Sequence, residues 1–424
     1  MDLIRSLKLD LSNNNIHQNI IFFSLMLMPA ALAAGPVVME MLIFIVCLSF
    51  ILLVTIKKIN FHIDKKVTVF LLFYLTIVLI SSFLSIDSIV SLKSGVLSFR
   101  FTIFILASIY LLNVFKPVYK YLFYTYFIIV LFLITDGYVQ FFFGKDFFLI
   151  PGINSTIITG VFGDEKKLGS FIARMIPILI GLSGILFEKK KTFLLSCSLI
   201  FFSIPLLIFT HERVTLIFVL ITIIFTAVYF WGVITDNIKL SFSFLFLLIF
   251  IPLLVFGLNI RNISSKVENT KIQIMGGGNK IKNVKFWSGQ HQAFAETALE
   301  IFKKNPIFGS GIKTYRISCQ QIRLDYDIIN CSTHPHNIFF QLLSETGLAG
   351  IFLYLVVLLI ISKELLCFFF GKNKRTLSIF FLLSFCFYYN PIFPSGQFFN
   401  NWYMGIGTFP LIFYFHNLIN KNDN

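Results

Sequence analysis

Two histidines, His334 and His336, open the stretch of this sequence in which residues capable of chemistry are most concentrated. This stretch, residues 333–350, joins a polar and basic segment to a long apolar run. Pro335 disfavours helical geometry at His334, so we predict a helix that begins near His336 or Asn337. An imidazole titrates near physiological pH and can take up a proton, so His336 is the candidate general base. The alternative is a histidine that caps the helix or forms hydrogen bonds within the loop.

Polar residues recur along the helix predicted after His336. Asn337, Gln341 and Glu345 are spaced four residues apart and therefore share one helix face. A polar stripe on an otherwise apolar helix is costly in a membrane unless it faces protein, water or a substrate.

Two arginines lie beside acidic residues at the ends of other apolar runs. Arg213 follows Glu212, and Arg174 comes shortly after Asp164 and Glu165. Each guanidinium can form an ion pair with the neighbouring carboxylate, and that of Arg213 can also extend to the membrane interface. The alternative is a bidentate grip on phosphate oxygens, whose geometry Lys cannot match. The sequence leaves these roles open.

The histidine and cysteine spacings do not predict a metal site. His334 and His336 could contribute two ligands, but no third and fourth ligand stand at a suitable spacing. His291 is interpreted as a residue of local loop structure. Cys319 and Cys331 lie in the same loop and can form a disulfide if their compartment is oxidising.

The composition is that of a membrane protein. Of the 424 residues, 57% are hydrophobic and 13% charged, whereas soluble domains are about 25% charged. The 55 phenylalanines are interpreted as packing and lipid-facing residues. A net charge of +15 could suggest nucleic acid, but in a polytopic protein the positions of the basic residues matter more than their sum, and we predict no nucleic-acid partner.

Apolar runs long enough to span a membrane, or nearly so, predict an all-α polytopic protein with about twelve transmembrane helices. The runs cover residues 20–34, 38–56, 67–86, 96–115, 121–136, 168–187, 192–210, 214–234, 240–259, 337–361, 376–389 and 402–416. Basic residues lie before the first run and after the second, fourth, sixth, eighth and tenth. All of these fall on one side if both termini are cytoplasmic, which the positive-inside rule favours.

With this topology four segments face outward, namely residues 137–167, 210–213, 261–335 and 389–402. The predicted organisation is one membrane domain, with helices 1–9 in residues 1–260, a large loop in residues 261–335 and helices 10–12 in residues 336–424. The large loop has eleven Lys or Arg against five Asp or Glu. Positive charge outside does not follow from the topology rule, so this loop is expected to meet anionic lipid or a phosphate-bearing substrate. Within it, residues 290–304 predict an amphipathic helix that lies on the membrane or caps a cavity.

Motifs for soluble nucleotide donors are absent. The sequence has no glycine-rich phosphate loop and no dinucleotide fingerprint. Because every candidate group lies outside, an enzyme of this topology would need an activated donor that the membrane carries.

The assembled residues resemble the O-antigen ligase and O-antigen polymerase family of bacterial inner-membrane glycosyltransferases. The most specific match is His334-Pro-His-Asn337 followed by Glu345, Gly347 and Gly350. Further matches are Asn305-Pro-Ile-Phe-Gly-Ser-Gly-Ile-Lys-Thr-Tyr-Arg316, Gly163-Asp-Glu165 with Arg174, Glu212-Arg213, and Phe398-Phe-Asn-Asn-Trp402. The stretch Phe286-Trp-Ser-Gly-Gln-His291 departs from the family, because it lacks the arginine that many members carry there.

The resemblance implies a lipid-dependent, GT-C-like glycosyltransferase fold with an active site at the periplasmic face of the inner membrane. The implied donor is a glycan on undecaprenyl diphosphate, and neither a metal nor another cofactor takes part. On this basis His336 would orient or deprotonate the acceptor hydroxyl, and Arg213 would neutralise the departing diphosphate. Arg316 is the candidate second cation, with Arg261 and Arg174 behind it. The other substrate-binding candidates are His334, Asn337, Glu345, Asp164 and Glu165. Of these, Asn337 and Glu345 would hold the start of the helix and the preceding loop in place.

The resemblance leaves the identity of the acceptor open. A ligase transfers the glycan to lipid A–core, a polymerase transfers it to a second lipid-linked glycan, and a related transferase glycosylates protein. We favour the ligase. A non-enzymatic transporter of lipid-linked glycans is the alternative from another class, but its usual internal repeats and midplane polar groups are not evident in the sequence.

Overall fold

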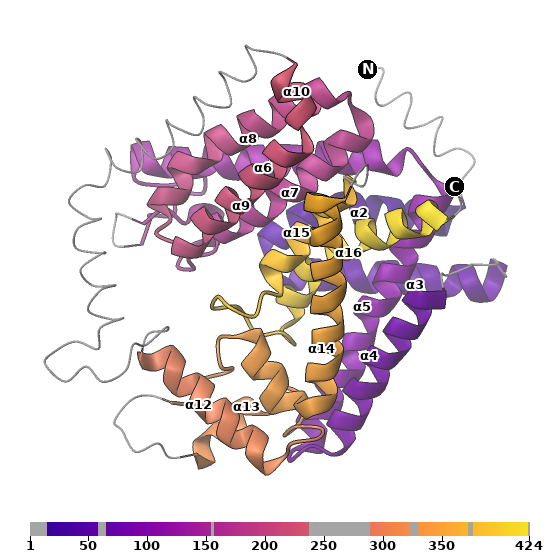
Figure 1. The fold of residues 1–424 in the computed structure, drawn as a ribbon, viewed down its shortest axis with the longest axis vertical. Coiled ribbons are helices and arrows are strands. Elements are labelled where there is room, and N and C mark those ends of the chain that lie inside the picture. The colour runs from indigo at the N-terminus through magenta and orange to yellow at the C-terminus, as the bar shows by residue number, and fades with distance from the viewer. Residues whose placement is uncertain are drawn as a thin grey trace, which may run out of the picture.

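The described part of this computed structural model is built from helices (Figure 1) and comprises residues 15–57, 65–153, 157–236, 289–322, 330–371 and 376–422. The side chains of Lys66, Arg213 and residues 418–422 are outside the description. Two isolated bridges, Lys145 with Pro151 and Ile153 with Ile157, are the extended pairings within these ranges.

Eleven of the twelve predicted spans coincide with helices. These are α2 (Ile16–Ala34), α3 (Pro36–Lys57), α4 (Lys65–Phe83), α5 (Ser88–Val114), α6 (Val118–Phe143), α7 (Leu168–Leu186), α8 (Lys189–Phe209), α9 (Arg213–Tyr229), α14 (Ile338–Phe370), α15 (Ser378–Tyr388) and α16 (Asn401–Asn422). The ninth predicted span, residues 240–259, lies outside the described residues. Among the described helices, seven are long and apolar enough to cross a membrane, and three more are apolar but shorter.

The remaining helices are short or belong to the large loop. They are η1 (Gly160–Phe162), α10 (Trp231–Thr235), α12 (Gly289–Lys304), α13 (Tyr315–Ser318) and η2 (Cys319–Gln321). The helix predicted at residues 290–304 is thus present as α12. Its apolar face packs on protein, because Phe294, Ala298 and Ile301 are buried and α12 lies against α14.

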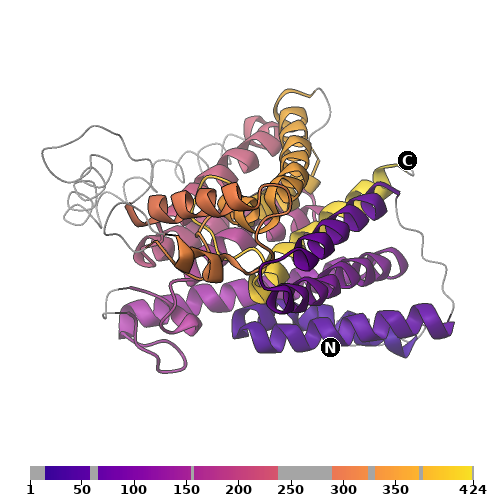
Figure 2. The ribbon, with the colours of Figure 1, turned by 90° about the horizontal axis from the view of Figure 1, so that it is seen from below.

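α14 is the central element of the fold. It stands between α4 and α5 on one side and α15 on the other, with α12 and α13 gathered at its first residues (Figure 1). Figure 2 shows α12 beside this end of α14, away from α2 and α3. Large apolar side chains such as Phe352 and Leu359 are more than half exposed on the far part of α14, as expected of a helix surface that faces lipid.

A sharp kink divides α14 at Gly347, which has φ 62° and ψ −154°. The kink frees backbone groups that an unbroken helix would pair internally. A loop preceding α13 satisfies them, because Ser310 and Gly311 donate to the carbonyls of Ser344 and Glu345 at 2.9 and 3.0 Å. In return, Leu348 and Ala349 donate to Pro306 and Ile307, at 2.8 and 3.1 Å.

These four hydrogen bonds join the loop of residues 306–311 to the kinked segment of α14, residues 344–349. A Cβ on Gly309 would collide with the backbone of Glu345, and one on Gly347 would lie 2.6 Å from the backbone of Ile307 and Gly309. The loop also reaches α4 and α5, since the hydroxyl of Ser85 donates to Ser310 at 3.0 Å. The start of α14 therefore has a fixed position relative to α4, α5 and α13.

Candidate active site

The backbone at His336 is strained and held by the segment before α16. His336 has φ 55°, in the left-handed region that non-glycine residues seldom adopt. Its carbonyl accepts a hydrogen bond from the amide of Ser395 at 2.9 Å. Strain of this kind persists where the surrounding structure fixes it, and it is common at functional sites.

The ring of His336 lies in a small hollow between α12 and the start of α14, lined by His291, Ala295, Phe340 and Pro394 among others. The imidazole stacks on Phe294 with ring centroids 5.3 Å apart, and the ring of His291 is 5.8 Å away. Partial burial lowers the pKa of His336, and the nearby His291 lowers it further. The ring is therefore neutral near pH 7 and able to accept a proton.

His334 faces into the protein and is 8% exposed. Its Nε2 lies 3.2 Å from the carbonyl of Ser395 and its Nδ1 lies 3.0 Å from the hydroxyl of Thr333. Because a carbonyl only accepts, we assign the proton to Nε2. Burial lowers the pKa of His334 to about 4, with His336 adding to the effect. His334 thus ties the loop before α14 to residue 395 as a neutral ring.

The predicted polar stripe is fully buried and faces protein. Asn337 is the N-cap of α14: its side chain accepts from the amide of Phe340 at 3.3 Å and donates to the carbonyl of Pro391 at 2.8 Å. The helix therefore starts where the sequence predicts. Gln341 donates to the Glu345 carboxylate at 2.9 Å and accepts from the amide of Phe398 at 2.8 Å.

Glu345 connects this stripe to the large loop. Its carboxylate accepts the amide of Tyr315 at 3.2 Å as well as the amide of Gln341. Tyr315 is itself buried, and its hydroxyl donates to the carbonyl of Phe294 at 3.2 Å. Asn337, Gln341 and Glu345 therefore position the loop, α13 and the segment before α16 around His336.

The loop Thr210–Arg213 forms a second polar cluster, at the start of α7. The two oxygens of Glu212 accept the amides of Gly169 and Ser170 at 2.9 and 3.1 Å, which satisfies donors that a helix leaves free at its N-terminus. Gly169 is required there, since a Cβ would collide with the hydroxyl of Thr210. Burial raises the pKa of Glu212 to about 7, against the opposing effect of those amides and Arg174.

The raised pKa of Glu212 predicts that the thermal stability of the protein depends on pH. Because its folded pKa of about 7 lies above the ordinary value of 4.5, the folded protein holds a proton that the unfolded chain has released. The stabilising contribution is fully present below the ordinary pKa and is lost as the pH rises through the folded pKa. We expect the thermal unfolding midpoint to fall between about pH 5 and about pH 8. Glu212→Gln, which carries no charge, should show a smaller fall.

The matched control for this experiment is Glu188→Gln, because Glu188 is exposed at the opposite end of α8. It should retain the pH dependence of the unaltered protein. An equally steep fall in the Glu212→Gln protein would contradict the assignment.

The side chains of two predicted cations, Arg213 and Arg261, are outside the described residues. The backbone of Arg213 begins α9 directly after Glu212, but its side chain is outside the described residues, as is the whole of Arg261.

Arg174 binds backbone carbonyls of the protein. Its guanidinium donates to Phe387 at 3.2 Å and to Ser170 at 3.0 Å, and it lies over the rings of Phe218 and Tyr388. The ion pair with Asp164 or Glu165 that the sequence left open is not formed. Arg174 instead joins α7 to α15 and α9.

Asp164 and Glu165 are exposed in the turn before α7. Glu165 forms an ion pair with Lys167, whose ammonium lies 4.6 Å above the ring of Trp402. The indole of Trp402 donates to the carbonyl of Leu32 at 2.9 Å. This turn is thereby connected to the first residues of α16 and the end of α2.

The large loop places Arg316 near the histidines. Arg316 is exposed on α13, and its charge acts on the pKa of His334 and of Lys313. Cys319 and Cys331 are joined by a disulfide that ties α13 to the residues before His334.

The position of His291 beside His336 was not predicted from the sequence, which indicated only a residue of local loop structure. In the structure α12 places this histidine beside His336, and burial lowers its pKa. The available signal was its place at the start of the amphipathic stretch, but nothing in the sequence specifies that α12 packs on the first residues of α14.

A comparison with known families bears on this region of the chain. Residues 198–355 match the family model described as O-antigen ligase. The match runs from the middle of α8 to the middle of α14 and includes the loop at Thr210–Arg213, Arg316, His336 and Glu345. It confirms the family resemblance predicted from the motifs. No curated protein matches the chain.

Proposed function

Because residues 198–355 match the O-antigen ligase family, we propose that the protein is a glycosyltransferase of this type. It transfers a glycan from undecaprenyl diphosphate to an acceptor hydroxyl, and lipid A–core is the acceptor we favour. The observation that carries the proposal is His336, a neutral imidazole held in a strained backbone position at a hollow between α12 and α14.

The proposed reaction is a displacement at the anomeric carbon. The acceptor hydroxyl attacks this carbon while its proton passes to the neutral imidazole of His336. A new glycosidic C–O bond forms, the C–O bond to the diphosphate breaks, and undecaprenyl diphosphate leaves with the electron pair. General base catalysis of this kind contributes roughly 10²–10⁴-fold to a rate. We propose that no metal takes part, because cationic side chains of the protein neutralise the leaving group.

Arg213 and Arg316 are the proposed cations. Arg213 starts α9 on a loop made rigid by the Glu212 cap, and Arg316 is exposed close to His334. Charge stabilisation of a leaving group is usually the largest single contribution to catalysis in such sites. Asn337, Gln341 and Glu345 are positioning residues in this mechanism.

The proposed setting is the bacterial inner membrane, with about twelve spans, both termini cytoplasmic and α12 and α13 at the periplasmic face. The distribution of Lys and Arg between the loops supports this orientation. A GT-C-like architecture is part of the same proposal.

Replacement of Arg213 tests its role. Arg213→Ala is expected to lower the transfer rate about 10²–10³-fold, the usual cost of losing one group that stabilises developing charge. Arg213→Lys should recover part of the rate, because lysine restores the charge without the bidentate geometry. The measurement is the initial rate of transfer at equal protein abundance. Lys190→Ala, an exposed basic residue on α8, is the control and should be fully active. Full activity of Arg213→Ala would rule out the role.

Deletion of the gene in the source bacterium tests the acceptor. The ligase predicts bare lipid A–core on a lipopolysaccharide gel, with long glycans remaining on undecaprenyl diphosphate. Lipid A–core carrying a single repeat unit would instead indicate the polymerase, in which the acceptor is a second lipid-linked glycan. An unchanged pattern in both pools would contradict the proposal and favour glycosylation of another acceptor, or transport.

A further inference from the structure

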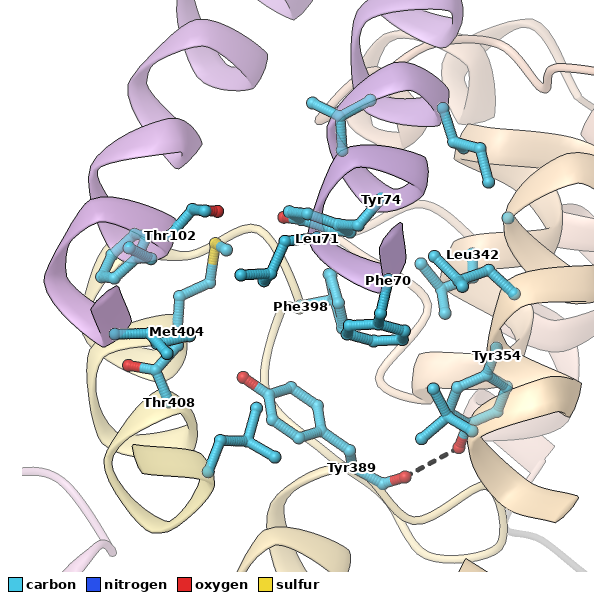
Figure 3. A pocket seen from close by; sticks show the side chains of 18 of the residues that line it. Phe70, Leu71, Tyr74, Thr102, Leu342, Tyr354, Tyr389, Phe398, Met404 and Thr408 are labelled. Carbon is cyan, nitrogen blue, oxygen red and sulfur yellow. Dashed lines mark hydrogen bonds between the residues drawn. The ribbon is translucent and has the colours of Figure 1, made fainter. Parts of the chain in front are cut away.

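A cavity lies at the ends of α5, α7 and α16 that are remote from the candidate active site. Its empty volume is about 750 Å³, including the part open to the surroundings, which is within the usual range of ligand pockets. Five of its eight lining residues are polar or charged. It differs in this from the cavity in Figure 3, whose walls, among them Phe70, Leu342 and Phe398, are almost entirely apolar.

The cavity and the candidate active site lie at opposite ends of α5. At the first end, the hydroxyl of Ser91 accepts the amide of Ile312 at 2.7 Å, and Ile312 follows the loop bonded to the α14 kink. Leu112, which lines the cavity, is 21 positions after Ser91 on α5, which corresponds to roughly 32 Å of helix. Because the hydrocarbon core of a bilayer is about 30 Å thick, the cavity lies at the opposite membrane surface.

Lys116 is the charged residue in the cavity wall. It lies in the turn between α5 and α6, is exposed and forms no ion pair with another described residue. Asn113, near the end of α5, also lines the cavity and is exposed. An ammonium and a side-chain amide both donate hydrogen bonds, and phosphate oxygens accept them. The wall therefore offers donors that suit an anion.

Further lysines surround the opening of the cavity. The two turns beside it, residues 115–120 and 187–191, contain five lysines and one acidic residue, Glu188. The turns are neighbours, because the ring centroids of Phe123 and Phe187 are 5.2 Å apart. The partial charges of the helix ends largely cancel, since α5, α7 and α16 end on this face while α6 and α8 begin there. The lysines therefore give the opening a positive charge.

The buried side of the cavity consists of polar groups that already have partners. The hydroxyl of Tyr119 lies 2.6 Å from Nδ1 of His416, and both residues are buried. Asn417 donates its side-chain amide to the carbonyl of Phe413 at 2.8 Å. These bonds fix α16 against α6, and they leave Lys116 as the group that can bind an incoming anion.

The remaining wall is apolar and favours a lipid over a soluble anion. It is formed by Leu112, Ile185 and Leu186 from α5 and α7, and Ile185 is 37% exposed. A free phosphate ester gains nothing from these side chains, whereas the start of an acyl chain buries apolar area against them. The positive-inside rule accounts for lysines at this surface, but not for a cavity that combines one with an apolar wall. Basic pockets between transmembrane helices bind anionic lipid head groups.

We propose that this cavity binds an anionic phospholipid from the leaflet opposite the candidate active site. The head-group phosphate lies at Lys116, and the start of an acyl chain lies against Ile185 and Leu186. This lipid is neither donor nor acceptor in the proposed reaction, so its binding does not depend on the proposed function. It contacts α5, α7 and α16 together, and a ligand that binds the folded protein raises its thermal midpoint.

Binding of phosphatidylglycerol to the purified full-length protein in detergent tests the proposal, by native mass spectrometry and by the rise in thermal midpoint. Lys116→Gln should weaken binding about fivefold, the usual contribution of one lysine near an anionic lipid surface, and should reduce the rise in midpoint. Lys363→Gln is the matched control, because Lys363 is exposed in the last part of α14 and outside the cavity. It should bind as the unaltered protein does.

A second pair of variants tests the apolar wall. Ile185→Trp fills it and should weaken binding of phosphatidylglycerol about fivefold or more, whereas Leu194→Trp, 44% exposed on α8 and outside the cavity, should not. Phosphatidylcholine, which has no net charge, should bind more weakly than phosphatidylglycerol to the unaltered protein.

Three results would overturn the proposal. The first is equal affinity for phosphatidylcholine, and the second is unchanged phosphatidylglycerol binding in either Lys116→Gln or Ile185→Trp. The third is competition by free glycerol 3-phosphate at the same concentrations as the lipid, which would indicate a site for a soluble anion. The assay contains no glycan, so failure of the proposed glycan transfer would leave its outcome unchanged.

Discussion

Replacing His336 with glutamine is expected to lower the rate of glycan transfer by roughly 10²–10⁴-fold, the usual contribution of a general base. Glutamine keeps hydrogen-bonding groups at this position but cannot take up the proton of the acceptor hydroxyl. The measurement is the initial rate in membranes with equal amounts of protein. His17→Gln, at the start of α2, is the matched control and should transfer at the normal rate.

The pH profile separates the role of a base from that of a structural histidine. The pKa of His336 is lowered, and the base acts in its neutral form, so activity should be retained down to the ordinary histidine pKa of 6.5. It should fall only at lower pH, as the ring becomes protonated. A rate that rises on acidification, or an unaltered rate in His336→Gln, would be inconsistent with the assignment.

Gly347→Ala is expected to have the largest effect on folding. The dihedral angles of Gly347 belong to a region that is essentially restricted to glycine, and a Cβ would lie 2.6 Å from the backbone of Ile307 and Gly309. Backbone strain and overpacking together predict a loss of roughly 2–6 kcal/mol in the free energy of unfolding. The measurement is the thermal midpoint of the purified protein, together with the fraction recovered monodisperse.

Gly144→Ala provides the comparison that isolates the packing contribution. Gly144 ends α6 with φ 77°, and a Cβ there would meet no atom within 4 Å. It should therefore cost only the strain of the left-handed conformation, about 1–2 kcal/mol. Similar losses of unfolding free energy in the two variants would mean that packing of the α14 kink against the loop before α13 contributes little to stability.

The helices and the start of α14 could be predicted because their causes are local. Apolar runs specify eleven of the described helices, and Pro335 with Asn337 specifies where α14 begins. The spacing of Asn337, Gln341 and Glu345 likewise predicts a shared and protected face. The kink at Gly347 was not predictable from its own segment, because its hydrogen-bonding partners lie 34 to 42 residues earlier in the chain.

Only part of the candidate site could be predicted, because some of its residues are positioned by nearby sequence and others by distant segments. His336 and the loop before α14 follow from a compact motif, whereas the approach of His291 depends on how α12 docks. Arg174 shows the converse: its acidic neighbours in sequence suggested an ion pair, but the folded chain brings the carbonyl of Phe387, far along the sequence, to the guanidinium. An apolar cavity that residues of α4, α5, α14, α15 and α16 line together could not be inferred from any single run.

The most direct test of the proposed glycan transfer is reconstitution with the purified protein. Vesicles would contain the protein, an undecaprenyl diphosphate-linked glycan and lipid A–core, with His336→Gln protein assayed in parallel. With the unaltered protein, glycan should move to lipid A–core and undecaprenyl diphosphate should be released in equal amount, and the variant should do neither. Absence of transfer by the unaltered, correctly folded protein, or equal transfer by the variant, would contradict it.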